Sequence, residues 1–366
     1  MRAITAESVT KGHPDLLADT CADAVLDSAL EQDSHSKVAC EVLLTGNTAI
    51  VAGEITTRAQ LNLPSIVHSV WPGCEVLSKV QSQAPALTQT VDQGLAGDQG
   101  ICLGYATDET PEMLPTPIAL AHRLARRLEE VRESGLLIYL RADGKTQVSV
   151  EYEGDKPVRI ATVVVSSQHD SAIDLDVLRS DLREHVVSIL PLMDEDTRVL
   201  VNAQAGRFEI GGPAGDTGLT GRKLALLYGP GMSAGGALSG KDPSKLDRSG
   251  AYMLRHIAKA VVSSGRAKRC QIEAAYCIGV ADPVALHVET FGTGLAFDVE
   301  AYVRTFPLTP EGIIEYLDLR RPIYRQTACY GHFGNAAFPW EQAPHPRGTK
   351  LAKGETYEGC KQKQWN

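Results

Sequence analysis

Hydrophobic and polar positions along the chain repeat one order of elements three times. In each round an amphipathic helix precedes two alternating strands joined by a turn, and a shorter helix follows. The long helices are expected over residues 14–30, 116–132 and 247–262, the hairpins over 37–56, 146–168 and 270–292, and the shorter helices over 61–70, 171–190 and 297–306. This order predicts an α+β protein of three similar sheet-and-helix repeats packed around a pseudo-threefold axis.

The predicted repeats run approximately over residues 1–95, 96–214 and 215–366, with the chain interleaving between them. Two irregular, glycine-rich joins are expected where the repeats meet, one over 96–110 and a longer one over 204–242. Such loops commonly carry the functional residues of a protein. The segment just before the first join, from Ala84 onward, has no clear period and is a candidate lid.

The first long helix is expected to begin at Pro14, because proline suits the first helical position. Its polar side carries an aspartate at every fourth residue: Asp15, Asp19, Asp23 and Asp27. Such a stripe is most simply a solvated face. Asp15 is the exception, because it lies in the first turn beside His13 and follows a glycine.

Composition excludes several classes of protein. With 366 residues the chain can form two or three domains with buried cores, and its net charge of −9 argues against a nucleic-acid partner. The eight cysteines include no C-x-x-C pair, so neither structural zinc nor a disulfide framework is expected. No apolar run has the length of a membrane span or of a signal peptide. A cytoplasmic protein that binds a small anion is therefore predicted.

The segment GGALSGKDPSKLDRSG (235–250) has the composition of a phosphate cradle. Its glycines leave backbone N–H groups accessible to an anion, Lys241 and Lys245 supply charge, and a helix expected to enter near Asp247 adds its N-terminal dipole. A P-loop is disfavoured, because Asp242 stands where Ser or Thr is required and no buried strand precedes the loop. The alternative interpretation is a solvated glycine loop with ordinary surface lysines.

Seven segments resemble, in chain order, motifs of the S-adenosylmethionine synthetases (methionine adenosyltransferases). They are GHPDLLAD, GEITT, GDQGICLGYATDET, GRFEIGGPAGDTGLTGRK, SGKDPSKLDRS, IGVADP and RPIYRQTACYGHFG. The resemblance spans Glu7 to Trp340 and implies a homodimer with shared active sites, which can pair into a dimer of dimers. The implied reaction joins ATP and L-methionine into S-adenosylmethionine and then hydrolyses the bound triphosphate to pyrophosphate and phosphate. The implied ions are Mg²⁺, two per site, and K⁺.

The chemistry explains why cations dominate these motifs. A thioether sulfur has no proton to lose, so its attack on the ribose C5′ needs no general base, and the demand falls on positioning and on the departing triphosphate. The chain offers as cations Lys145, Arg222, Lys223, Lys241 and Lys245. By resemblance, His13 acts with them and assists C–O cleavage. Asp15 and Asp247 match the magnesium ligands, and Glu41 matches the carboxylate of the potassium site.

Further substrate contacts follow from the same resemblance. Residues matching those that hold methionine are Glu54, Gln83, Asp98, Asp216 and Lys245. Residues matching ATP contacts, besides His13 and the cations, are Asp143, Asp216, Phe208 and Ile278, the last two against adenine. Simpler alternatives exist: Glu41 and Glu54 could face solvent, Asp98 could bond to its own turn, and Phe208 could be a core residue. The remaining motif histidines are expected to be structural: His122, His169, His256 and His332.

The chain departs from the family pattern near the predicted site. Leu16 stands where the family has a lysine, and residues 224–234 are shorter than usual and lack an acidic residue. The candidate lid also looks shortened. If the missing charge limits turnover, Leu16→Lys should raise the rate. These departures favour an alternative function, a non-catalytic paralogue that binds nucleotide or regulates an active synthetase.

Overall fold

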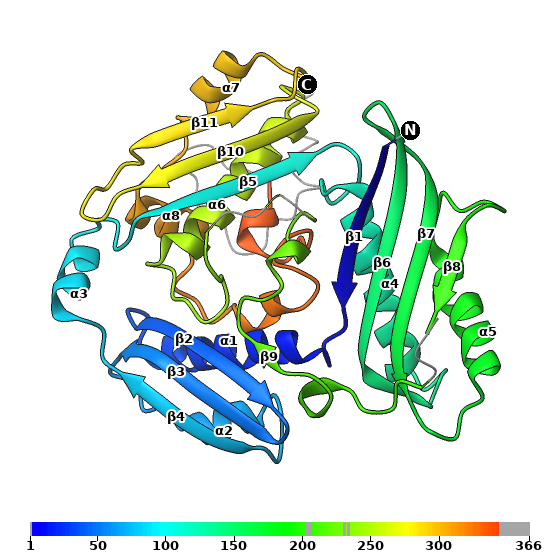
Figure 1. Cartoon of the computed structure of the whole chain (residues 1–366). Coiled ribbons are helices and arrows are strands. Elements are labelled where there is room, and N and C mark those ends of the chain that lie inside the picture. Colours follow the sequence, from blue (N-terminus) through cyan, green and yellow to red (C-terminus); the bar gives the residue numbers. More distant parts are fainter. Residues whose placement is uncertain (1, 203–206, 230–231, 233–234, 344–366) are drawn as a thin grey trace, which may run out of the picture.

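In the residues that the structure describes, three β-sheets surround a central group of helices (Figure 1). The computed structural model describes residues 2–202, 207–229, 232 and 235–343. The strands are β1 (Arg2–Val9), β2 (Lys37–Thr45), β3 (Thr48–Thr56), β4 (Glu75–Gln81), β5 (Gly100–Thr107), β6 (Leu140–Glu153), β7 (Lys156–His169), β8 (Arg198–Val201), β9 (Gly218–Leu219), β10 (Arg269–Tyr276) and β11 (Ala285–Glu289). The helices are α1 (Pro14–Gln32), α2 (Leu63–His68), α3 (Pro85–Asp92), α4 (Thr116–Glu133), α5 (Leu175–His185), α6 (Leu246–Ser263), α7 (Ala296–Val303) and α8 (Pro310–Leu317), with 3₁₀ turns η1 (Val187–Ile189), η2 (Gly212–Ala214), η3 (Leu224–Leu226), η4 (Arg325–Ala328) and η5 (Pro339–Glu341).

The predicted hairpins are present as β2–β3, β6–β7 and β10–β11, all antiparallel, so the α+β class is confirmed. Strands from other parts of the chain extend each hairpin. The sheet orders are β1-β6-β7-β8, β11-β10-β5 and β4-β3-β2-β9. Strand β1 therefore pairs with the middle of the chain, and β5 pairs with a strand of the last third.

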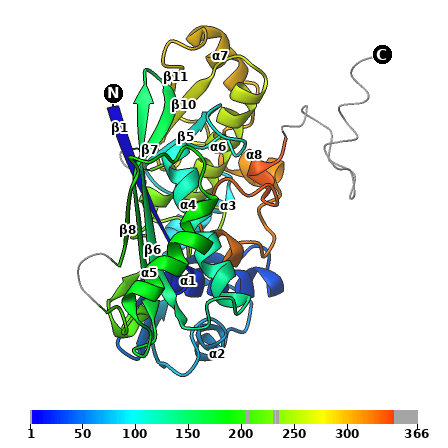
Figure 2. The ribbon, with the colours of Figure 1, turned by 90° about the vertical axis from the view of Figure 1, so that its right-hand side faces the viewer.

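Each sheet has one face covered by helices, and Figure 2 shows the sheets on one side of the molecule and the helices on the other. The alternation along β2 is the cause: Val38, Cys40 and Val42 are buried, whereas Ala39 and Glu41 lie on the open face. Helix α1 covers β2, α4 covers β1 and β6, and α6 covers β5 and β10. The open faces of the sheets therefore point away from the helices.

Helix α6 lies unusually close to β5, because Gly104 has no side chain. A Cβ at this position would come 2.1 Å from the backbone carbon of Leu254. The close approach brings the first turn of α6 to the start of β5, where Gly100 lies against the carboxylate of Asp247.

The prediction of a solvated aspartate stripe on α1 is wrong. Asp23 is fully buried and accepts hydrogen bonds of 2.7 and 2.8 Å from Arg248, which is also fully buried. Asp19 is buried and accepts a 2.8 Å bond from the N–H of Gly221. Burial, reinforced by the charges of Asp23 and Asp15, raises the pKa of Asp19 to about 8. The polar stripe therefore binds α1 to the C-terminal third of the chain.

The glycine-rich join at 96–110 is not irregular, because most of it forms β5. The candidate lid contains a helix, α3, which begins at Pro85. Strands β1, β4 and β8 were not anticipated, since their short apolar runs lack a turn partner next to them in the sequence. Residues 230–231 and 233–234 of the shortened segment lie outside the described residues.

Seven of the eight cysteines are described, and all seven are free thiols; Cys360 lies outside the described residues. Across the described ranges, no helix has the length and apolarity needed to cross a membrane.

Candidate active site

The predicted site residues fall into two groups. We call the first the histidine cluster. Its charged or titratable residues interact with one another, and they are His13, Asp15, Asp143, Lys145, Asp216, Arg222 and Lys223. Phe208 adjoins them, because it bonds to His169, whose neighbour Gln168 accepts a hydrogen bond from Asp143. We call the second the lysine pocket, a cavity of about 520 Å³ whose lining includes Glu54, Gln83, Asp98, Lys241, Lys245 and Asp247. Glu41 and Ile278 line neither group directly.

The histidine cluster is built on the first turn of α1. His13 is the N-cap residue, and its Nδ1 accepts a 3.2 Å hydrogen bond from the N–H of Asp15. The Asp15 carboxylate accepts a 2.9 Å bond from the N–H of Leu219 and forms an ion pair with Lys223. Arg222 lies 3.7 Å from the same carboxylate. One carboxylate thus gathers two of the predicted phosphate-binding cations.

His13 is held in its neutral form. Burial and the positive charge of Lys223 lower the pKa of His13 to about 4. Because Nδ1 accepts a hydrogen bond, the single ring proton lies on Nε2. His13 can therefore donate one hydrogen bond from Nε2 without carrying charge.

Lys145, Asp143 and Phe208 complete this cluster from the central part of the chain. Lys145 lies on β6 and pairs at 2.6 Å with Glu7 of the neighbouring strand β1. Asp143 accepts a 2.7 Å bond from the N–H of Gly212, and burial raises its pKa. The backbone of Phe208 exchanges hydrogen bonds with His169, which gives that histidine the structural role predicted for it.

The lysine pocket lies where the first turn of α6 meets β2 and β5. Lys241 forms an isolated bridge to Ala39 of β2 and pairs with Asp247 at 2.5 Å. Lys245 donates to Asp242 at 3.2 Å and to the Oε1 atom of Gln83 at 3.3 Å. Asp242, which excluded a P-loop, therefore holds a lysine of this pocket.

Two buried donors in the lysine pocket have no partner among the described residues. They are the Nε2 atom of Gln83 and the Oγ atom of Ser244, in side chains that are 8% and 5% exposed. A buried polar group without a partner is costly, so each of these atoms calls for a partner such as a water molecule or a ligand. Ser244 was missed from the sequence, although it lies directly before Lys245 in the same motif.

Glu54 and Asp98 supply the negative side of the lysine pocket. Glu54 accepts a 3.2 Å bond from Gln81 on the neighbouring strand. Asp98 accepts a 2.7 Å bond from the N–H of Gln99, the local turn contact that was its simpler interpretation. Each carboxylate keeps further acceptor capacity, because a carboxylate has about four lone-pair sites.

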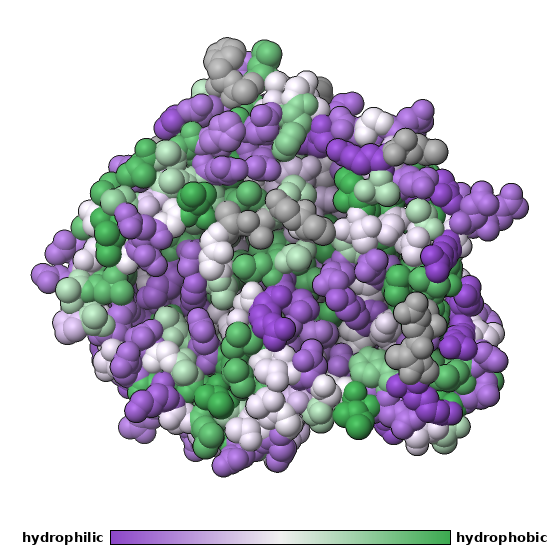
Figure 3. Space-filling view, viewed as in Figure 1, coloured by the Kyte–Doolittle hydropathy of each residue, from purple (hydrophilic) through white to green (hydrophobic). Residues whose placement is uncertain are grey.

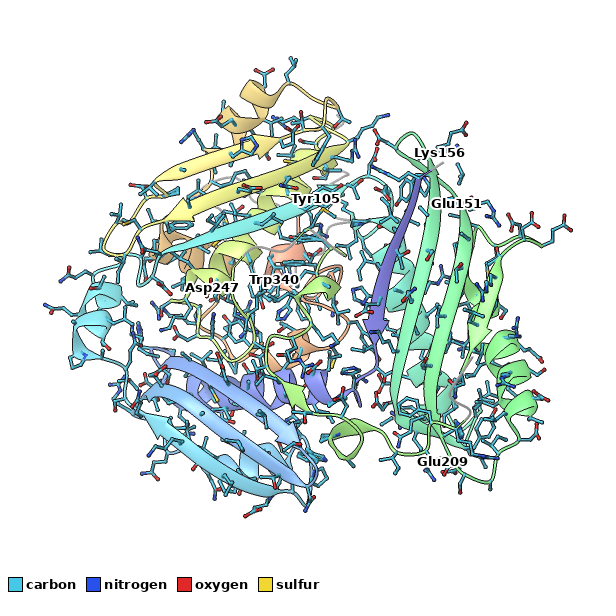
Figure 4. The ribbon with its side chains drawn as sticks, in the orientation of Figure 1. Tyr105, Glu151, Lys156, Glu209, Asp247 and Trp340 are labelled. Atoms are coloured by element: carbon cyan, nitrogen blue, oxygen red, sulfur yellow. The ribbon has the colours of Figure 1, made fainter. Side chains whose placement is uncertain are left out.

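A single chain does not bring the two groups together. Strand β2 runs between them, with Ala39 beside Lys241 and Leu43 beside Leu219. Four residues of strand separate these positions by about 13 Å. The predicted adenine contacts are divided as well: Ile278 lies next to Gly279, which bonds to Ala96 near the lysine pocket, whereas Phe208 belongs to the histidine cluster. Figure 4 shows Asp247 near the middle of the molecule and Glu209, next to Phe208, beyond the lower end of the sheet β1-β6-β7-β8.

Comparisons with known proteins cover almost the whole chain. Sequence models of the S-adenosylmethionine synthetase N-terminal, central and C-terminal domains match residues 1–84, 93–208 and 210–342. The chain belongs to the S-adenosylmethionine synthetase family. Its relatives include the S-adenosylmethionine synthases of Desulforudis audaxviator, at 49% identity over 92% of this chain and 95% of that protein, and of Desulfosudis oleivorans, at 47% over 92% and 95%. The synthase of Sorangium cellulosum is 47% identical over 95% of this chain and 89% of that protein.

Leu16 packs in the core of this synthetase-family chain, so its position is not a site that lacks a charge. It is 1% exposed and forms a small apolar cluster with Val9 and Leu226. Leu226 belongs to residues 224–234, the segment that is predicted from the resemblance to be shortened and to lack an acidic residue. One apolar contact therefore links two departures that looked independent in the sequence.

We expect Leu16→Lys to destabilise the protein by about 2–4 kcal/mol, because it buries an unpaired charge. This replaces the expectation from sequence that the substitution raises turnover. The measurement is the free energy of unfolding in urea, with Leu16→Met as the control of similar volume. Adding Leu226→Asp should recover part of the loss by supplying a partner for the lysine. A stable single variant with a raised rate would contradict the packing interpretation.

Proposed function

We propose that the chain forms S-adenosylmethionine by attack of the methionine sulfur on the ribose C5′ of ATP, and then hydrolyses the triphosphate to pyrophosphate and phosphate. The observation that supports this most directly is the arrangement of charges. Each group places lysine against an aspartate, Lys223 against Asp15 and Lys241 against Asp247. Cations positioned in advance can stabilise the charge that develops on a departing triphosphate.

The proposed role of His13 follows from its protonation state. A neutral imidazole with its proton on Nε2 can donate to the oxygen that leaves C5′, without adding another charge to the lysines nearby. No residue is needed to take a proton from the sulfur. The remaining rate enhancement would come from holding sulfur, carbon and leaving oxygen in line.

The lysine pocket suits the amino-acid end of methionine. Gln83, Ser244 and Lys245 present donors for the α-carboxylate, and Glu54 and Asp98 present acceptors for the α-ammonium. Apolar lining is also available for a thioether side chain, from Leu87, Val91 and Leu246. Under this proposal Ser244 is a further methionine-binding residue.

Replacing Ser244 by alanine should raise KM for methionine by about tenfold or more and leave kcat almost unchanged, because one hydrogen bond to the charged α-carboxylate is lost in both ground and transition states. The matched control is Ser263→Ala, at the C-terminal end of α6, the helix that follows Ser244. Steady-state kinetics with methionine varied at saturating ATP would test this. Equal KM values in both variants would remove Ser244 from the substrate site.

The carboxylates fit the ions that the family resemblance implies. Asp15 and Asp247 offer the hard oxygen ligands that Mg²⁺ prefers, and no group of three or more His, Cys, Asp or Glu side chains with metal-binding geometry occurs in the described part of the chain. Mg²⁺ typically binds through one or two carboxylates together with substrate phosphates. Bound there, Mg²⁺ would neutralise phosphate charge, and two ions per site are proposed.

Glu41 is proposed as the potassium ligand. It lies exposed on the open face of β2, next to Cys40, whose N–H donates to the carbonyl of Gly240. Ser239, which precedes that glycine, has a buried Oγ atom without a partner among the described residues. Carboxylate and hydroxyl oxygens are the hard ligands that a cation such as K⁺ prefers.

A homodimer would unite the two groups. We propose that the open sheet faces of two chains meet, so that the histidine cluster of one chain lies opposite the lysine pocket of the other. Figure 3 views the sheet side of the molecule, where apolar and polar side chains are mixed. Exposed apolar side chains on or beside these strands include Ile50, Leu77, Ile101 and Ile278. A dimer of dimers, the pseudo-threefold relation of the sheets and a cytoplasmic location belong to the same proposal.

The first experiment is to incubate the purified protein with ATP, L-methionine, Mg²⁺ and K⁺ and to follow S-adenosylmethionine and phosphate together. Both products should form in step. If well-folded dimer forms neither product, the alternative of a non-catalytic, regulatory paralogue is favoured. ATP hydrolysis that is independent of methionine would instead revive an ATPase function.

A further inference from the structure

A second cavity opens on the helix side of the molecule, away from the open sheet faces. We call it the outer cavity; its volume is about 540 Å³, within the usual range for small-molecule sites. Its walls come from α1, α4, η4 and the segment after η4. Leu17 and Thr20 of α1 line it, whereas Asp15 and Asp19 of the same helix bond to the segment 219–221, near the histidine cluster.

The charged side chains that line the outer cavity all carry positive charge. Lys11, Arg126 and Arg325 line it, and no aspartate or glutamate does so among the described residues. This is unusual in a chain whose net charge is −9. Three cations from separate elements therefore converge on one hollow, and such a concentration of charge attracts anions.

Arg126 is the cation most available to a ligand. Within the described ranges its guanidinium donates to no acceptor, and it lies 5.2 Å from the ring centroid of Tyr330. Lys11 is half exposed and reaches Glu129 and Glu133 only at 3.6 and 3.8 Å. A guanidinium fixed beside an aromatic ring can still form bidentate bonds with a carboxylate or a phosphate.

Tyr330 provides a rigid wall for this cavity. Its φ of 61° lies in the left-handed region, which is rare for a bulky residue and is often found at functional sites. Its hydroxyl donates to the buried carboxylate of Glu129, which Arg132 also contacts at 3.2 Å. The ring is thereby held in place, and Leu17 and Val70 extend the apolar surface beside it.

We infer that the outer cavity is a binding site for a small organic anion with a flat apolar body, bound through Arg126 and packed between Tyr330 and Leu17. No residue of the histidine cluster or of the lysine pocket lines this cavity, so the inference does not depend on the proposed function. Occupancy would place a ligand against the side of α1 opposite Asp15 and Asp19.

Phenyl phosphate is a suitable probe, and its binding can be measured by isothermal titration calorimetry on the full-length protein. Arg126→Gln should weaken binding by about tenfold or more, because a charge-assisted contact is lost. Arg123→Gln, an exposed arginine on the same helix that does not line the cavity, is the matched control and should bind as the wild type does. Lys241→Met should also leave this binding unchanged, because Lys241 lines the lysine pocket.

A second readout locates the probe. The Cys329 thiol lines the outer cavity, whereas Cys277 does not. Burial raises the pKa of Cys329 to about 11, so alkylation by iodoacetamide is followed at pH 9 over a long incubation. Bound phenyl phosphate should slow the alkylation of Cys329, as measured by peptide mass spectrometry, and leave Cys277 unaffected. Benzyl alcohol, which lacks the charge, should give no protection. The inference is overturned if phenyl phosphate does not bind, if Lys241→Met abolishes binding while Arg126→Gln does not, or if Cys329 is not protected.

Discussion

Replacing Lys241 by methionine should reduce kcat/KM for S-adenosylmethionine formation by about a thousandfold or more while the fold remains intact. Lys241 pairs with Asp247 at 2.5 Å in a pocket whose other lysine, Lys245, is held by Asp242. Its loss removes a cation from the developing triphosphate charge and leaves the Asp247 carboxylate without its ion-pair partner. Removal of one donor of this type commonly costs about 10²–10³ in kcat, and a full charge costs more.

Lys268→Met is the matched control, because Lys268 is an exposed lysine that belongs to neither the histidine cluster nor the lysine pocket and lies beyond the C-terminal end of α6. Thermal unfolding of both variants would show whether the fold is retained. Near-normal turnover of Lys241→Met, with an unchanged melting temperature, would reject the role proposed for the phosphate cradle.

Replacing His13 by asparagine should lower kcat by about 10²–10³ with little change in KM for either substrate. Asparagine is a favourable N-cap residue, so the first turn of α1 and the position of Asp15 should be retained. What is lost is the Nε2 donor, which asparagine is too short to replace. Loss of a donor used mainly in the transition state lowers kcat rather than binding.

The pH dependence separates this role of His13 from a general base. With a pKa of about 4, His13 is neutral throughout pH 6–8, so it should contribute no ionisation to the rate profile in that range. The pH dependence of stability is an independent test. In the unfolded chain His13 binds a proton below pH 6.5, whereas in the folded chain it stays neutral down to about pH 4. The free energy of unfolding should therefore fall as the pH decreases from 6.5 to 4. His13→Asn should weaken this loss. A rate that follows a group titrating near pH 6.5 and disappears in the variant would contradict a neutral histidine.

The two inactive variants together test whether active sites are shared. In a mixed dimer of His13→Asn and Lys241→Met chains, one site combines the intact cluster of one chain with the intact pocket of the other. Random mixing should therefore restore about a quarter of wild-type activity from two inactive proteins. No recovery after verified subunit exchange would place each active site within one chain.

Much of the element order could be predicted because amphipathic periods are local. The strands β6 and β7 follow from alternation, and the helix α4 follows from a period of 3.6, each within an element of fewer than twenty residues. Strand β5 could not be predicted in this way, because its partner β10 lies more than 150 residues further along the chain. Its glycines suggested an irregular loop, whereas Gly104 is needed for the close approach of α6.

Prediction of the site residues had the same limit. Motif resemblance singled out His13, Asp15 and Lys241, but it gave Ser244 no weight, because nothing in its local sequence indicates a buried hydroxyl without a partner. The neutral state of His13 also depends on Lys223, which is distant in the sequence.

The sequence by itself determined the family, the α+β class and the order of the elements, since motifs and periodic patterns are carried by consecutive residues. Only the tertiary structure decided which polar residues of α1 are buried, that Leu16 packs against Leu226, and that the site residues divide into two groups along β2. The physical reason is that burial and charge pairing are properties of contacts through space. Asp23 and Arg248, 225 positions apart in the chain, form their ion pair only when both leave water together.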